Sequence, residues 1–177
     1  TREFALDGEQ RHRWWPLAPR SRIEVQLEEP GLSWSGDGYW DENFGDEALE
    51  NAFENWNWSR ATVGDEAAIL YDITRRGGSR AAMALRIDAH GDVGAMELPE
   101  LVPLPSTGIW RVPRHTQADL GQGRIIRTLE DTPFYSRSEI ATRLLGQETI
   151  AMHESLALGR LRSPVVKSLL PWRMPRN

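Results

Sequence analysis

Short segments in which apolar and polar residues alternate constrain the fold of this 177-residue chain more than any other feature. In residues 22–27 (RIEVQL) every second residue is apolar, which is typical of a strand with one buried face. Similar segments occupy residues 68–74, 81–88, 93–98, 108–112, 124–130, 135–144 and 149–156. Turns that contain Gly77, Gly91 and Gly146 separate several of these segments. The pattern predicts an all-β fold, an antiparallel barrel or sandwich.

Two segments have helical rather than strand character. Residues 47–56 place four apolar side chains three or four positions apart, on one face of a helix. Ser163 followed by Pro164 is typical of the start of a helix, and Pro171 would end it. We therefore expect one or two short helices beside the strands.

Composition excludes several classes of protein. The chain has no cysteine, which rules out disulfides, thiolate metal sites and cysteine nucleophiles. Its four histidines are scattered without a pair at ligand spacing, so we expect no metal site. A net charge of −5 without a basic run disfavours nucleic-acid binding. No apolar run approaches the roughly 18 residues of a transmembrane helix. No glycine-rich phosphate loop leads into a helix, which disfavours nucleotide chemistry.

Residues whose side chains could take part in catalysis or binding lie in three clusters. The first is residues 12–19 (HRWWPLAP), and the second is residues 36–45 (GDGYWDENFG), leading into 53–61 (FENWNWSRA). The third is residues 152–156 (MHESL). Six of the eight tryptophans lie between residues 14 and 58. Such a concentration either packs a core or lines an apolar site.

The second cluster contains Asp41 among aromatic residues, and it has two interpretations. In one, it is a surface loop in which Asp41 and Asn43 hydrogen-bond their own backbone. In the other, aromatic rings exclude water from a carboxylic acid and favour its neutral, proton-donating form. His12 and Trp14 would share one face of a strand, either as a base beside a cation-stabilising ring or as a packed edge.

Strand geometry separates the acidic residues of this cluster. Tyr39 and Asp41 are two residues apart, so an extended strand points both side chains to the same side. Trp40 and Glu42 then point to the other side. We therefore favour Asp41 over Glu42 as the acid.

In their order and spacing, these clusters resemble the carotenoid 1,2-hydratases, also called hydroxyneurosporene synthases. The matching motifs are His12-x-Trp14-Trp15-Pro16-x-Ala18-Pro19, Tyr39-x-Asp41-x-Asn43-x-Gly45, Phe53-x-x-Trp56-x-Trp58-x-Arg60-Ala61, residues 131–138 (DTPFYSRS), residues 153–156 (HESL) and Pro171-x-Arg173-Met174-Pro175. They extend from residue 12 to near the end of the chain. Trp40, Glu42 and Phe44 stand where some members carry His or Trp, which leaves the shape of the pocket open.

The resemblance implies a lipocalin-like fold of two antiparallel β units that share a lipid-sized cavity. On this basis residues 1–61 are the end of a first unit that carries the catalytic motifs, and residues 62–177 are the second unit. A further N-terminal portion, in the same chain or a partner chain, is expected ahead of residue 1.

The resemblance also implies an activity, the addition of water to the terminal C1–C2 double bond of a lycopene- or neurosporene-type carotenoid. The functional residues of the family fall on His12, Trp14, Tyr39 and Asp41. A neutral Asp41 would protonate C2, and the face of Trp14 or Tyr39 would stabilise the tertiary cation at C1. His12 would position and deprotonate the attacking water. This chemistry requires no cofactor and no metal.

Further residues are assigned supporting roles. Aromatic side chains expected to contact the polyene substrate are Trp15, Trp40, Phe44, Trp56 and Trp58. Asn43 and the pair His153–Glu154 are the candidates for positions around the catalytic residues, although for that pair a strand-end histidine with a solvated neighbour is the favoured interpretation.

Two other functions remain open. One is a lipocalin-like lipid- or carotenoid-binding scaffold without catalysis, and the other is a related pocket that runs a different cation or pericyclic reaction. A cytoplasmic protein peripherally associated with a membrane is expected, because the substrate resides in lipid and the C-terminal segment is basic. Alternatively, the short C-terminal helix plugs the barrel and its basic residues are merely solvated. The bases of that segment are Arg160, Arg162, Lys167, Arg173 and Arg176.

Overall fold

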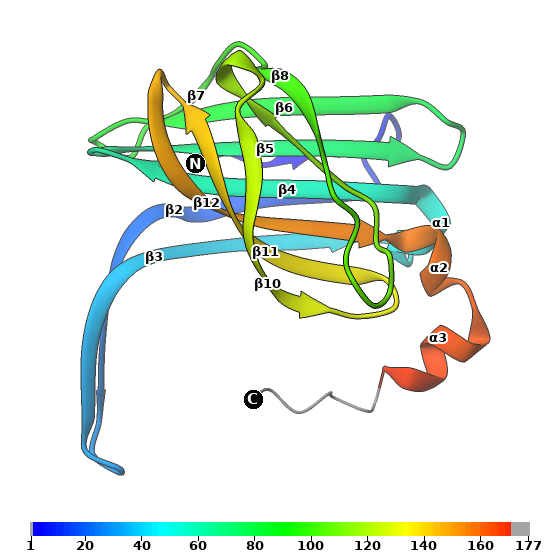
Figure 1. Ribbon diagram of the computed structural model, residues 1–177, viewed down its shortest axis with the longest axis horizontal. Helices are drawn as coiled ribbons and strands as arrows, with labels where there is room; N and C mark the ends of the chain where they lie inside the picture. Colours follow the sequence, from blue (N-terminus) through cyan, green and yellow to red (C-terminus); the bar gives the residue numbers. More distant parts are fainter. Residues whose placement is uncertain (1, 171–177) are drawn as a thin grey trace.

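The computed structural model describes residues 2–170 and consists almost entirely of antiparallel strands (Figure 1). One sheet has the order β1-β2-β3, with β1 Phe4–Ala5, β2 His12–Leu27 and β3 Leu32–Gly45. A second has the order β10-β11-β12-β4-β5-β6-β7. Its strands are β4 Phe53–Val63, β5 Glu66–Arg75, β6 Arg80–Ile87, β7 Val93–Ala95, β10 Gly123–Asp131, β11 Tyr135–Leu144 and β12 Gln147–Ala157. The third is a hairpin of β8 Glu100–Leu104 and β9 Arg114–Ala118. The predicted all-β, antiparallel class is confirmed.

The helices are short, as predicted. They are α1 Leu49–Ala52, α2 Leu158–Leu161, α3 Pro164–Leu169 and the 3₁₀ turn η1 Asp119–Gly121. α3 begins at the predicted Pro164, with Ser163 in the extended N-cap conformation.

The helix predicted for residues 47–56 is wrong beyond its first turn. α1 ends at Ala52, and Phe53 adopts the extended conformation that begins β4. From there β4 hydrogen-bonds to β12 on one side and β5 on the other, which pairs its backbone groups along its length. Trp56 and Trp58 then alternate with Asn57 across the two faces of the sheet. Strand pairing therefore outweighs the helical spacing of the apolar side chains.

Two predicted strands also differ from the structure. Residues 108–112 are a loop between β8 and β9, in which the Val112 amide donates to Thr107 Oγ1 at 2.9 Å. The strand predicted for residues 93–98 is shortened to β7. β11 spans the predicted residues 135–144 without change.

The seven-stranded sheet has a different partner on each face. On one face it packs against the β1-β2-β3 sheet, and the core there contains Trp14, Trp56, Trp58 and Tyr71. On the other face it curls around the β8–β9 hairpin, with Leu70 and Ile140 in a second apolar cluster. In Figure 1 the β2–β3 layer is drawn below β4, and the green hairpin that begins with β8 crosses in front of β4, β5 and β6. Neighbouring residues of one strand therefore face different compartments.

The β2–β3 hairpin bends sharply away from the body of the protein (Figure 1). The pairing register between the strands shifts twice, between Trp15 and Ala18 and again before Ser21. Pro16 and Pro19 lie in this stretch of β2 and have no backbone N–H to donate, so the ladder is interrupted there. The bend divides the hairpin into a packed base, which carries the motifs, and a projecting arm formed by residues 20–37.

The predicted division into units at residues 61 and 62 falls within β4. β4 is the central strand of the seven-stranded sheet, whereas β1, β2 and β3 form a sheet of their own. The division remains a prediction.

Candidate active site

Asp41 projects from β3 into the layer between the two sheets and is held there by two hydrogen bonds. The Trp14 indole Nε1–H donates to Asp41 Oδ2 at 2.7 Å, and the Tyr39 hydroxyl donates to the same oxygen at 2.8 Å. Trp14 lies on β2 opposite Asn43, so the side chains of Trp14, Tyr39 and Asp41 come from the base of one hairpin. The predicted grouping of Trp14, Tyr39 and Asp41 is therefore present in the structure.

Both donors reach the same carboxylate oxygen. Within residues 2–170, Asp41 Oδ1 receives no hydrogen bond from another side chain or amide. An oxygen that accepts two short hydrogen bonds is poorly placed to carry a proton, so a neutral Asp41 would carry its proton on Oδ1. The geometry thus fixes the carboxyl plane and leaves one oxygen for a reacting partner.

Aromatic rings from the other sheet complete the surroundings of Asp41. The Trp58 ring lies 5.1 Å from the Tyr39 ring, and the Tyr71 ring lies 4.9 Å from the Trp14 ring. Trp14 has no exposed surface. Burial and the adjacent Asp41 carboxylate raise the pKa of Tyr39 far above its usual value. Burial likewise raises the pKa of Tyr71. Both phenols therefore keep their protons and act as hydrogen-bond donors.

Asn43 follows Asp41 on the same side of β3 and is bonded to the second sheet. The Tyr71 hydroxyl donates to Asn43 Oδ1 at 3.1 Å. The predicted supporting position of Asn43 is consistent with this contact, since the bond joins the hairpin base to β5.

His12 is buried at the start of β2 and is bonded to a different carboxylate. Its Nδ1 lies 2.8 Å from Asp7 Oδ2, and its ring meets the Phe53 ring edge-on at 4.8 Å. The side chain is essentially unexposed, and its Nε2 has no hydrogen-bond partner among the described residues. The hydrogen bonds of the described residues connect His12 to Asp7 and not to the Trp14–Tyr39–Asp41 group. Its predicted role as a base remains a prediction.

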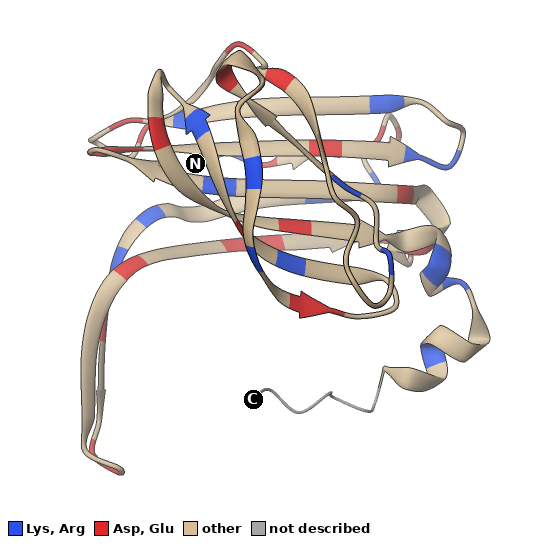
Figure 2. Ribbon diagram, in the orientation of Figure 1, with Lys and Arg blue, Asp and Glu red and all other residues tan. Residues whose placement is uncertain are grey.

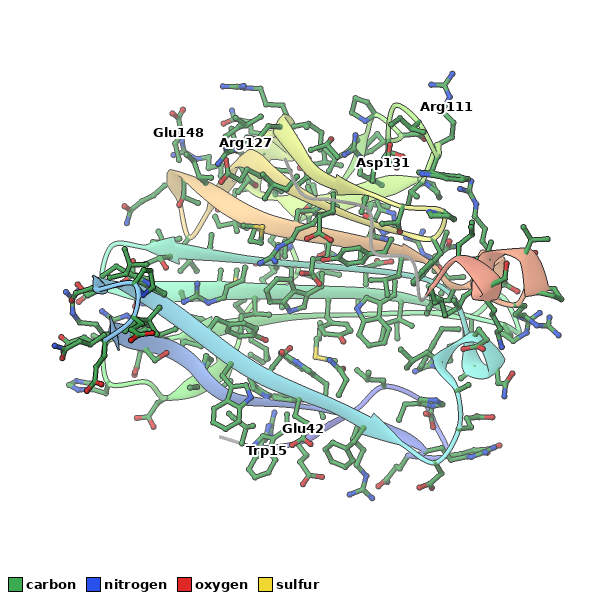
Figure 3. All side chains as sticks on the ribbon, turned by 90° about the horizontal axis from the view of Figure 1, so that it is seen from below. Trp15, Glu42, Arg111, Arg127, Asp131 and Glu148 are labelled. Carbon is green, nitrogen blue, oxygen red and sulfur yellow. The ribbon has the colours of Figure 1, made fainter. Side chains whose placement is uncertain are left out.

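The five predicted substrate-contacting aromatic residues fall on two sides of the hairpin. Trp56 and Trp58 are buried between the sheets. Trp40 is 64% exposed and Phe44 39%, both on the outer side of the hairpin. Trp15 also lies on that outer side, beside Glu42, and Figure 3 shows both side chains directed away from the seven-stranded sheet. The predicted outward orientation of Trp40 and Glu42 relative to Asp41 is confirmed.

The predicted pair His153–Glu154 is divided between the two faces of β12. His153 is buried on the face toward β9, where its Nε2 donates to the His115 carbonyl at 2.8 Å. Burial lowers the pKa of His153 to about 4. Glu154 faces the opposite way, beside Trp58 of β4. Adjacent residues of a strand cannot share one side of a sheet, so the two do not act as a pair.

A buried polar network that the sequence did not predict lies on the His153 face. His115 Nε2 is 2.8 Å from Asp72 Oδ1, Arg80 contacts the same carboxylate at 3.3 Å, and the Ser155 hydroxyl donates to Asn57 Oδ1 at 2.5 Å. Burial raises the pKa of Asp72, but the hydrogen bonds and positive charges of His115 and Arg80 together outweigh burial, and the net shift is downward. The only sequence signal for this polar network is the position of Asp72 within an otherwise apolar run.

A cleft of about 260 Å³ opens beside this network, lined by Asn55, Asn57, Thr74, Arg80, Pro113 and His115. It lies on the face of the seven-stranded sheet opposite Asp41. Among residues 2–170, no three His, Asp or Glu side chains are grouped so that they could hold a metal ion.

The sequence matches known proteins along its whole length. The family model described as carotenoid hydratase CrtC matches residues 1–177. The acyclic carotenoid 1,2-hydratase of Thiocapsa roseopersicina is 54% identical over 176 residues, which are 99% of this chain and 44% of that protein. The protein of the same name from Rubrivivax gelatinosus is 42% identical over 175 residues, which are 98% of this chain and 43% of that protein. The chain thus spans less than half the length of these two relatives.

Among solved structures, a putative AttH from Nitrosomonas europaea has a similar fold. Its TM-score is 0.53 at 15% sequence identity, and the match covers 83% of this chain and 52% of that one. This likeness concerns the fold alone. The match of the family model over all 177 residues, together with the relatives described above, shows that the chain belongs to the carotenoid hydratase CrtC family.

Proposed function

We propose that the protein containing this chain adds water to the terminal C1–C2 double bond of an acyclic carotenoid of the lycopene or neurosporene type. In this proposal Asp41 protonates C2, and water captures the tertiary cation that forms at C1. Homologues that carry the name acyclic carotenoid 1,2-hydratase support the substrate class.

The observation that carries the proposal is the double hydrogen bond to one oxygen of Asp41. An unactivated alkene requires a strong, fixed acid, because its protonation creates a full positive charge in an apolar molecule. Trp14 and Tyr39 hold the carboxyl group, and its other oxygen is available to deliver a proton. A surface loop whose aspartate bonds its own backbone would show neither contact.

The rings around Asp41 suit the cation that follows protonation. Tyr39, Trp58 and Trp14 present aromatic π-systems within one layer. An aromatic face stabilises a cation by about 2 kcal/mol when water is excluded. The same rings offer an apolar surface to the polyene, which has no charge for an ion pair to recognise.

Incubation of the whole gene product that contains residues 1–177 with lycopene in lipid vesicles tests this function. We expect a product heavier by one water molecule, with its oxygen derived from labelled water and one deuterium at C2 when the solvent is D₂O. Binding of lycopene without any such product would instead identify a carotenoid-binding protein.

We also propose that the protein contacts a membrane surface through α3. Among residues 2–170, no helix is long and apolar enough to cross a membrane. The side chains of Val165, Leu169 and Leu170 are exposed. Figure 2 shows basic residues on α2 and α3. The predicted tail residues 171–177, which include Trp172, Arg173 and Arg176, lie outside the described residues.

Replacement of Val165, Leu169 and Leu170 by serine is expected to reduce sedimentation with anionic phosphatidylglycerol vesicles several-fold, because less apolar surface enters the lipid interface. Ile150→Ser is the matched control, since Ile150 is 61% exposed on β12. Equal, salt-insensitive sedimentation of both variants and the wild type would contradict a role for α3.

A further inference from the structure

A second carboxyl group faces the same layer as Asp41 but comes from the other sheet. Glu154 of β12 lies directly opposite Trp58 of β4 in the strand register, on the same face. The Trp58 ring packs at 5.1 Å against Tyr39, and the Tyr39 hydroxyl donates to Asp41. One aromatic pair thus connects the two carboxyl groups.

Glu154 is partly buried and is bonded to neighbouring side chains, unlike a fully solvated surface residue. Its side chain is only 30% exposed. The Tyr135 hydroxyl donates to Glu154 Oε1 at 3.0 Å, and Arg137 Nε lies 3.7 Å from the same oxygen, both from β11. The charges of Asp41 on β3 and Glu130 on β10 also act on it. These groups hold Glu154 through Oε1, and within residues 2–170 no hydrogen bond or ion pair reaches its Oε2.

The balance of these groups makes Glu154 a better base than a free glutamate. Burial raises its pKa, the Tyr135 hydrogen bond and Arg137 lower it, and repulsion by Glu130 and by Asp41 raises it, the latter once Asp41 has given up its proton. The net shift of the Glu154 pKa is upward. A carboxylate with a raised pKa accepts a proton from water more readily than an unperturbed one.

We propose that Glu154 is the catalytic residue that accepts the proton of the attacking water. The inference rests on the hydration proposed above and assigns to Glu154 the role that the sequence suggested for His12. His12 is enclosed by Asp7 and Phe53, whereas Glu154 faces the layer that contains the acid.

The steps balance in protons and electrons. The O–H bond of Asp41 breaks as the π-electrons of C1=C2 form the new C2–H bond, which leaves a cation at C1. A lone pair of water forms the C1–O bond, and the O–H bond of that water breaks as its proton passes to Glu154. One proton then returns from Glu154 to Asp41 through solvent, which restores both groups.

The test uses Glu154→Gln in the whole gene product, with lycopene in D₂O. We expect hydration to fall by about 10²-fold, a typical contribution of a positioned base. Because Asp41 still protonates C2, the cation should lose a proton instead of capturing water. Unhydrated carotenoid carrying deuterium at C2 should therefore accumulate. Glu148→Gln, at the far end of the same strand (Figure 3), is the matched control and should behave as wild type.

A second variant provides a readout that a purely structural role would not change. Tyr135→Phe removes a hydrogen bond that favours the carboxylate, so the pKa of Glu154 should rise. The acid limb of the pH profile of kcat/KM should then move to higher pH, with the fold unchanged by circular dichroism.

Three results separate the possibilities. Hydration by folded Glu154→Gln within a few-fold of wild type would overturn the inference. Loss of both hydration and deuterium incorporation would also overturn it, since Glu154 would then act before the cation forms. If the wild type neither hydrates lycopene nor incorporates deuterium, the proposed function itself fails.

Discussion

Replacement of Asp41 by asparagine is expected to reduce carotenoid hydration by at least about 10²-fold, because the amide cannot deliver a proton to C2. Asparagine preserves the shape of the side chain, and its Oδ1 can still accept from Trp14 and Tyr39 in place of the carboxylate oxygen. Carotenoid binding should therefore remain near wild type. The measurements are turnover of lycopene and quenching of tryptophan fluorescence by bound polyene.

Glu42→Gln is the matched control for this substitution. Glu42 is the next residue of β3, but its side chain points away from the second sheet (Figure 3). The Glu42→Gln variant should hydrate carotenoid at a rate within a few-fold of wild type. Near-normal turnover by Asp41→Asn, with its fold verified by circular dichroism, would remove Asp41 from the mechanism.

Acidification is expected to destabilise the fold by about 3 kcal/mol through His153 alone. Burial lowers the pKa of His153 in the folded protein to about 4 from an ordinary value of 6.5. Between these values the unfolded chain binds a proton that the folded protein does not. The free energy of unfolding that depends on neutral His153 is therefore fully present above about pH 6.5 and is lost as the pH falls to about 4.

Urea unfolding across this pH range, in wild type and His153→Gln, measures the effect. Glutamine can still donate to the His115 carbonyl but does not titrate. The free energy of unfolding of His153→Gln should therefore fall less steeply between pH 6.5 and 4 than that of the wild type. His90→Gln, in an exposed turn, should follow the wild-type curve. Parallel curves for wild type and His153→Gln would show that His153 does not carry this pH dependence.

The fold class follows from the sequence because strand alternation is a local property. Residues 135–144 alternate buried and half-buried side chains along their whole length, and β11 has these bounds. The segment 47–56 misleads because its aromatic residues also match helical spacing. Only the pairing of β4 with the following strand β5 and with β12, which is distant in the sequence, decides for a strand.

The candidate site is predictable where it is contained in one hairpin. The spacing of Tyr39 and Asp41 places both on one side of β3, and Trp14 meets them through the β2–β3 register. The orientation of Glu154 could not be predicted, because it depends on which face of β12 packs toward Asp41 and which, with His153, packs toward β9. The Asp72–His115 contact joins β5 to β9, a strand that the alternation did not reveal.

The division of the site between two sheets has a consequence for substrate selectivity. The hydrogen-bond geometry of Asp41 is set by strand register within one hairpin, whereas the rings of Trp58 and Tyr71, which face it, belong to the other sheet. Under the proposed function, a change of ring size at residue 58 or 71 would alter the room for a polyene end group while Asp41 keeps its hydrogen-bond partners. Selectivity for the carotenoid and strength of the acid would then diverge independently.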